Sequence, residues 1–178
     1  MDSKKVVAGF VRPNWILVVI LMLIPFVGFF AFVAFLCGTL PTLLRANKNL
    51  KKIEDAGKME QAAKELTSAN GKKLMNGKLI LTENFVFCKA TGYIFTYDEI
   101  LWAYRHRQTN TVLFIPIQVI DSLYLAAKGM KPRMVVSMGK DKLEEIKAAI
   151  LEIYNHNQNC IIGYTNESVA KYKSLPNK

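Results

Sequence analysis

Two short basic clusters are the strongest candidates for binding an anion. One stands at the end of an apolar run, and the other surrounds a turn that contains Gly129 and Pro132. Their members are Arg105, His106, Arg107, Lys128, Lys131 and Arg133. Guanidinium and ammonium groups make charge-assisted hydrogen bonds to phosphate, so convergence of the two clusters would create an anion or lipid-headgroup site. A solvated basic face is the alternative.

Asp98 and Glu99 form the one adjacent pair of carboxylates that precedes a predicted strand, and His106 follows on that strand. Such groups could act as general acid and base in a small membrane-bound enzyme. Asp98 is equally suited to capping a turn, and no catalytic motif accompanies the pair. We therefore expect no catalytic residues, and the enzyme remains the alternative.

The three cysteines, Cys37, Cys88 and Cys160, lack the spacing of a metal site, and no phosphate-binding glycine loop is present. We therefore expect neither a metal nor a cofactor. Cys88 and Cys160 stand next to apolar residues, which favours free buried thiols over a disulfide.

The chain carries no charged residue from Pro13 to Leu44, and residues 15–40 are almost all apolar. A bilayer core requires about 20 helical residues, so this run predicts a transmembrane helix over 15–44 that contacts the lipid bilayer through residues 15–40. A re-entrant hairpin bent at Pro25 is the alternative.

Charge next to this run predicts its orientation. The chain has 178 residues and a net charge of +10, and the segment after the apolar run is more basic than the tail over 1–14. Its first basic residues are Arg45, Lys48, Lys51 and Lys52. The positive-inside rule then predicts a single-pass protein of the cell membrane with a cytoplasmic C-terminal domain. Because part of the charge brackets the apolar run, and no recognition motif is present, we do not expect nucleic-acid binding.

Beyond the apolar run, residues 45–70 predict an amphipathic linker helix that ends at Asn70 and Gly71. The pattern then alternates, which predicts an antiparallel meander of short strands separated by turns. The expected strands cover residues 78–82, 85–89, 93–97, 99–107, 111–117, 122–127 and 133–138. Helices are expected over 141–155, capped by Asp141, and over 167–174, capped by Asn166.

The segments LTENFVF, YIFTYDEILWAYRHR and GYTNESVAKY resemble those of uncharacterised bacterial membrane proteins with a pleckstrin-homology-like (PH-like) or GRAM-like domain. The resemblance implies a PH-like domain over 71–178, with a partly open barrel closed by the 141–155 helix and a binding or scaffolding role. The predicted fold class is α+β: an N-terminal transmembrane helix followed by a PH-like antiparallel β-barrel closed by a C-terminal helix. PH domains that bind phosphoinositides draw basic residues from their first hairpin, whereas Thr82, Glu83 and Asn84 make an acidic turn here.

Together these observations predict a membrane-anchored, non-catalytic interaction or scaffold module that binds a protein partner or the anionic membrane surface. Its oligomeric state is left open by the sequence.

Overall fold

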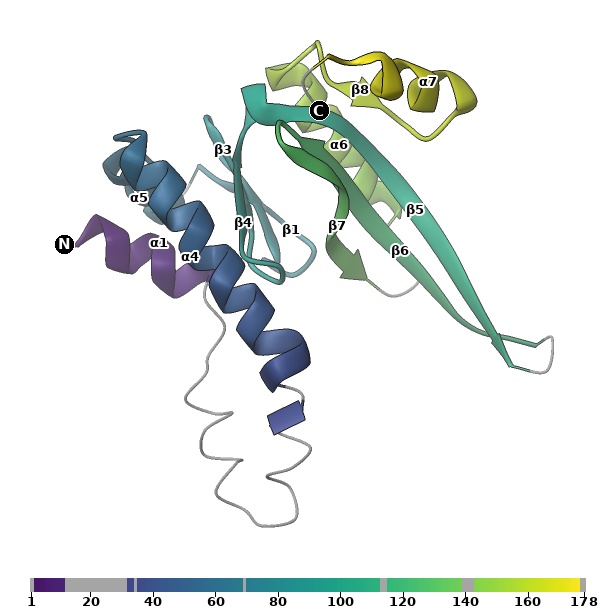
Figure 1. Cartoon of the computed structure of the whole chain (residues 1–178), viewed down its shortest axis with the longest axis horizontal. Helices are drawn as coiled ribbons and strands as arrows, with labels where there is room; N and C mark the ends of the chain where they lie inside the picture. Colours follow the sequence, from purple (N-terminus) through teal and green to yellow (C-terminus); the bar gives the residue numbers. More distant parts are fainter. Residues whose placement is uncertain are drawn as a thin grey trace. The chain divides into compact units, whose positions relative to one another are not determined.

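A computed structural model describes residues 2–11, 32–33, 35–68, 70–112, 115–138 and 143–176 (Figure 1). The chain divides into two compact units. The first comprises Met1–Gly71 and Phe87–Ile94, and the second comprises Lys72–Val86 and Phe95–Lys178.

The first unit is mainly helical. Its elements are α1 (Ser3–Val11), the π-helical turn η1 (Phe35–Thr39), α4 (Leu40–Asp55) and α5 (Met59–Thr67). Helix α4 buries Ala46, Leu50 and Ile53, whose spacing aligns them on one face. The linker helix predicted over 45–70 is divided in two, because Gly57 adopts φ +67° and ends the helical path after α4.

Among the described residues, no helix combines the length and the apolar character needed to cross a bilayer. Helix α1 has 9 residues, and the 16 residues of α4 include several charged side chains. The finding contradicts the predicted single-pass transmembrane helix over 15–44 and the predicted location in the cell membrane. Residues 15–31 and 34 of that prediction lie outside the described residues.

Strands form two four-stranded sheets. The first has the order β1-β2-β3-β4, with bounds Lys72–Leu74, Leu79–Leu81, Phe85–Cys88 and Tyr93–Thr96. The second has the order β7-β6-β5-β8, with bounds Met130–Met138, Ile115–Ala127, Ile100–Val112 and Ile161–Ile162. Most predicted strands are therefore confirmed, although the turn expected after Arg107 is replaced by continuous strand to Val112.

Neither sheet of the described chain closes on itself, so the predicted PH-like barrel is wrong. Two features of the strands explain the difference. The strands of the first sheet are only three or four residues long. In the second sheet β5 and β6 are each 13 residues long and pair mainly with each other. Strand β8 pairs with β5 only near the beginning of the outer edge of β5. The fold is α+β with two open sheets.

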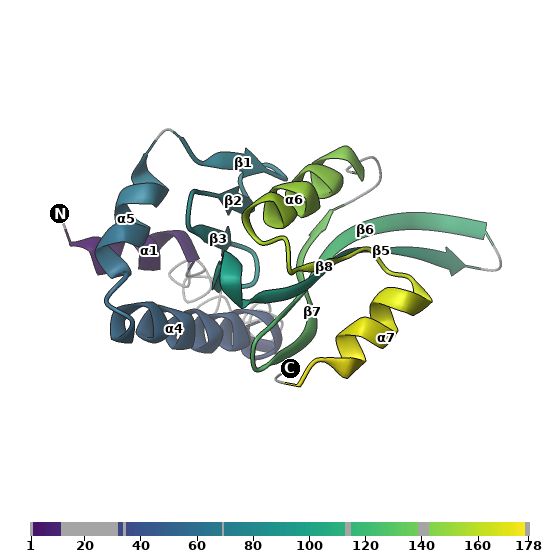
Figure 2. The same cartoon turned by 90° about the horizontal axis from the view of Figure 1, so that it is seen from above.

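Two helices complete the second unit: α6 (Leu143–His156) and α7 (Asn166–Ser174). Helix α6 buries Ile146, Ala149 and Ile153, and α7 lies next to β8 (Figure 2). The N-cap of α7 is Thr165, which exchanges capping hydrogen bonds with Ser168, and not Asn166 as predicted. Asp141, the predicted cap of α6, lies outside the described residues.

Candidate functional site

The strand register separates the two predicted basic clusters. Arg105 is opposite Leu123 on β6, whereas Lys128 follows Ala127, which is opposite Ile100. Lys128 therefore lies about five residues from Arg105 along β5, which corresponds to about 17 Å at 3.4 Å per residue, whereas Arg133 is level with Ala103 and lies two strands away from β5. The register does not bring them together at one turn.

Arg105 is bound to another side chain of the sheet. Its Nε and Nη2 atoms lie 2.8 Å and 2.5 Å from Oδ1 of Asp121. The Asp121 side chain is only 3% exposed, whereas that of Arg105 is 27% exposed. Arg105 thus compensates a buried carboxylate. Its neighbours His106 and Arg107 are both exposed.

The second basic cluster surrounds the β6–β7 turn and the start of β7. Lys128, Lys131 and Arg133 are all exposed, and Arg133 is opposite Leu125 in the register. The backbone N–H of Lys128 donates to the carbonyl of Glu99 at 2.9 Å, which fixes the turn at the beginning of β5. These residues give this end of the sheet a basic character.

The four basic residues predicted to lie beside a membrane are all on α4. Arg45 donates from Nη1 to the carbonyl of Thr91 at 3.0 Å and lies 4.7 Å above the ring of Tyr93. Both contacts hold the β3–β4 turn of the first unit. Lys48, Lys51 and Lys52 are exposed on the solvent side of the helix.

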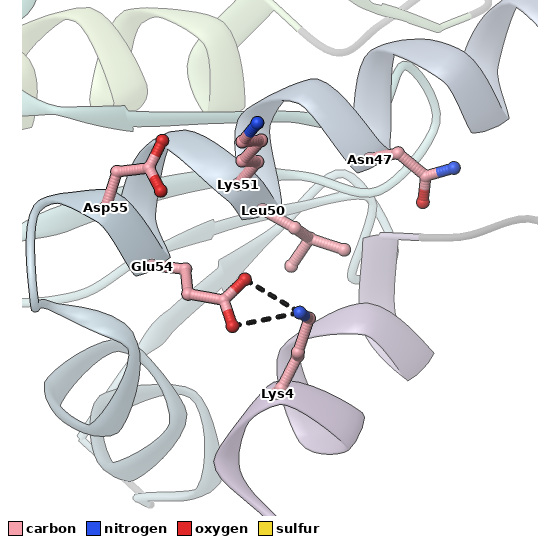
Figure 3. A pocket seen from close by; sticks show the side chains of 6 residues that line it. All are labelled: Lys4, Asn47, Leu50, Lys51, Glu54 and Asp55. Carbon is pink, nitrogen blue, oxygen red and sulfur yellow. Dashed lines mark hydrogen bonds and ion pairs between the residues drawn. The ribbon is translucent and has the colours of Figure 1, made fainter.

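A small open cavity of about 390 Å³ lies between α1 and α4 (Figure 3). Nζ of Lys4 lies 2.9 Å and 2.7 Å from the two carboxylate oxygens of Glu54. The remaining lining residues are Asn47, Leu50, Lys51 and Asp55. Because its charges are of both signs, and two of them already pair with each other, this cavity offers little to a charged ligand.

The residues of the alternative enzyme do not form a cluster. Asp98 and Glu99 belong to the short helix η2 (Tyr97–Glu99) before β5, whereas His106 lies on β5 beyond Arg105. The other histidine, His156, stacks on Tyr97 at a ring separation of 4.1 Å. Among the described residues, no group of His, Cys, Asp and Glu side chains could hold a metal ion.

All three cysteines are free thiols, and Cys88 and Cys160 are buried as predicted. Burial raises the pKa of both buried thiols, to about 12 for Cys160. A high pKa keeps a thiol protonated, so neither is suited to act as a nucleophile at neutral pH.

The most distinctive surface of the second unit is an aromatic face on the second sheet. Directly opposite residues share a face of an antiparallel sheet. Trp102 is opposite Ala126, Tyr104 is opposite Tyr124, and Tyr124 is opposite Met134 on β7. We define the aromatic face by its side chains, which are Trp102, Tyr104, His106, Tyr124, Met134, Tyr164 and Tyr172.

The rings of the aromatic face form a connected stack. Trp102 lies 4.4 Å from Tyr104 and 5.6 Å from Tyr164, and the planes of Trp102 and Tyr164 differ by only 7°. Tyr104 stacks on Tyr124 at 5.3 Å, and Tyr172 of α7 lies 5.0 Å from Trp102. The indole Nε1 of Trp102 donates to the carbonyl of Gly163 at 2.7 Å, which anchors the segment bearing Tyr164.

The aromatic face has a buried base and an exposed rim. Trp102, Tyr104 and Tyr172 are buried, and burial is the main cause of the raised pKa of the Tyr104 and Tyr172 hydroxyls. By contrast, Tyr164 is 63% exposed and Met134 is 41% exposed, and His106 is exposed beside Tyr124. Large aromatic and Met side chains held rigidly at a surface are characteristic of protein interfaces.

Sequence reasoning found only part of this surface. Trp102 and Tyr104 alternate with Ala103 and Arg105 in the sequence, which indicates that the two aromatic side chains share one side of a strand. Tyr124 and Met134 join them only through the strand register. Tyr164 joins through the hydrogen bond between Trp102 and Gly163, for which the sequence contains no local signal.

No protein-family model, curated protein or solved structure matches the chain. The resemblance to PH-like domains therefore stays a prediction.

Proposed function

We propose that this chain is a non-catalytic interaction module that binds a protein partner through the aromatic face. The proposal retains the interaction role expected from the sequence and drops the membrane anchor, which the described helices contradict.

The supporting observation is the parallel stack of exposed Tyr164 on buried Trp102. An aromatic side chain that is already held in place loses little conformational entropy when a partner covers it. The contacts of Trp102 with Tyr104, Tyr172 and the Gly163 carbonyl supply that rigidity. Met134 and Tyr124 extend the same surface across β6 and β7.

Most of the basic side chains lie on the opposite face of the sheet, because Arg105 and Arg107 alternate with Tyr104 and His106 along β5, and Arg133 precedes Met134 on β7. From Ile100 to Met138 the sequence contains five Lys or Arg residues and a single acidic residue, Asp121, which is bound to Arg105.

The test is a selection of peptides from a displayed library on the full chain, followed by affinity measurements on the enriched sequences. Truncation of an interface anchor costs about 2 kcal/mol or more, so Tyr164→Ala should weaken binding by about 30-fold. Leu151→Ala is the matched control, because Leu151 is 58% exposed on α6 and is not part of the aromatic face. Equal affinity of the Tyr164→Ala and Leu151→Ala variants, or failure to enrich any peptide, would contradict the proposal.

A further inference from the structure

The outer edge of β5 is open along most of its length. Strand β8 pairs in parallel with β5 only at Trp102 and Ala103. The remaining neighbour of β5 in the sheet is β6, on its other side. From Arg105 to Thr111, therefore, no strand of the described chain pairs with this edge.

The same segment extends beyond the rest of the sheet (Figure 1). The pairing of β6 with β7 ends where Asp121 meets Met138, whereas the pairing of β5 with β6 continues to Val112 and Ile115. The far half of the hairpin is thus a two-stranded ribbon. Such a ribbon gains stability when a third strand joins it.

The backbone groups that face the open edge can be identified. The carbonyl of Ala103 accepts a hydrogen bond from the N–H of Gly163, so it points outward, away from β6. Backbone groups of alternate residues point to the same edge of a strand. Arg105, Arg107 and Thr109 therefore present their N–H and C=O groups to the open edge.

The charge of this edge selects its occupant. Residues 104–112 contain Arg105, His106 and Arg107 and no acidic side chain. Pairing with a second copy of this chain would place the same basic residues from both copies close together, which is unfavourable. An acidic strand would instead place carboxylates beside exposed Arg107.

We propose that an extended acidic segment of a protein partner pairs with the outer edge of β5 between Arg105 and Thr111. The segment alternates acidic and apolar side chains: the acidic ones lie beside Arg107, and the apolar ones lie on the side of Tyr104 and His106. The inference rests on the proposed function in taking the partner to be a protein, and it assigns that partner's chemistry and its mode of binding.

The probe is a fluorescent peptide that alternates Glu and Val. One control replaces Glu by Lys, and another carries N-methyl groups on the backbone amides, which preserves the charge and prevents strand pairing. With the wild-type chain we expect the Glu–Val peptide to bind about tenfold or more tightly than either control, measured by fluorescence anisotropy. Equal binding of the N-methylated peptide would show simple charge attraction and overturn the inference, as would failure of the Glu–Val peptide to bind.

Variants of the chain test the edge directly. Thr109→Pro removes an N–H that faces the open edge and should abolish binding, while Thr109→Ala keeps that N–H and should not. Arg107→Glu should weaken binding of the Glu–Val peptide by about tenfold or more and strengthen binding of the Lys–Val peptide. Urea unfolding identical to that of the wild type shows that each variant is folded. If Thr109→Pro is unfolded, two other results test pairing at the edge. They are the preference of the Arg107→Glu variant for the Lys–Val peptide over the Glu–Val peptide, and the binding of the N-methylated peptide to the wild-type chain.

The two proposals fail separately. In one case Tyr164→Ala loses peptide binding, while Thr109→Pro and Arg107→Glu bind as the wild type does. This result overturns pairing at the edge and leaves the aromatic face as the binding surface. In the other case Thr109→Pro and Arg107→Glu lose peptide binding, while Tyr164→Ala binds as the wild type does. This result supports pairing at the edge and contradicts the role of the aromatic face.

Discussion

The ion pair between Arg105 and Asp121 gives the sharpest prediction about stability. Exposed ion pairs contribute about 0–1 kcal/mol, whereas removal of one partner from a buried pair costs about 3–5 kcal/mol, because a charge is left buried and uncompensated. Asp121 is 3% exposed, but Arg105 retains 27% exposure. We therefore expect Arg105→Met to lower the free energy of unfolding by about 3 kcal/mol, at the lower end of the buried range.

The assay is equilibrium urea unfolding followed by tryptophan fluorescence. A Trp15→Phe background leaves Trp102 as the single emitter, since the chain has two tryptophans. At a slope of about 2 kcal/mol per molar urea, a loss of about 3 kcal/mol lowers the midpoint by about 1.5 M. Lys72→Met is the matched control. Lys72 forms an ion pair with Glu152, and their side chains are 49% and 30% exposed, respectively, so this pair should contribute about 1 kcal/mol or less.

The double variant Arg105→Met with Asp121→Leu separates two explanations. Removal of both charges leaves no uncompensated carboxylate, so the double variant should be more stable than Arg105→Met alone. A role for Arg105 in compensating the buried carboxylate is refuted if Arg105→Met lowers the free energy of unfolding no more than Lys72→Met. It is also refuted if the double variant is as unstable as the single one, because the loss would then come from packing of the Arg105 side chain.

Three further predictions concern the backbone, the thiols and the tyrosines. Gly92→Ala should lower the free energy of unfolding by about 2–4 kcal/mol in thermal unfolding, because Gly92 has φ +70° and an added Cβ would lie 2.9 Å from the Thr42 carbonyl oxygen. The control Gly129→Ala should lower it by about 1 kcal/mol, because Gly129 has φ +72° and open space around it. Equal losses in the two variants would contradict the close approach at Gly92. Under mildly alkaline native conditions iodoacetamide should label Cys37 and spare the two buried thiols until urea is added, as mass spectrometry can show; equal labelling of all three would exclude their burial. Burial raises the pKa of Tyr104 to about 12, so the stability contributed by this shift is complete below about pH 10 and is lost as the pH rises toward 12. Tyr104→Phe should therefore flatten the decline of the urea midpoint over this pH range. An unchanged slope in the Tyr104→Phe variant would refute the prediction.

Local patterns predicted most of the strands and the two C-terminal helices. Alternation of apolar residues is visible over short windows, and strands β2, β3 and β4 lie within the segments expected to contain them, while β7 includes the expected segment 133–138 and begins earlier, at Met130. The division of the linker helix into two helices follows from the left-handed conformation of Gly57.

The predicted transmembrane helix is contradicted by the part of the chain that the structure describes, in which no helix has the length and apolar character to cross a bilayer. An apolar run indicates that side chains avoid water, but it does not determine which helices form or how long they are. Within the described chain, Leu40 already begins α4, which continues into the charged residues up to Asp55 and buries Ala46, Leu50 and Ile53. The helix is therefore amphipathic, and its apolar side is covered by the first unit itself.

What the sequence determined by itself was local: the positions of strands and helices, the free buried cysteines and the basic character of β5. What the tertiary structure decided was which of these meet. Strand register placed Arg105 diagonally across from Asp121, with which it forms an ion pair, and separated it from Lys128, and it joined Tyr104, Tyr124 and Met134 into one face. The physical reason is that pairing between strands depends on contacts distant in the chain, and a shift of one residue would transfer every side chain to the opposite face.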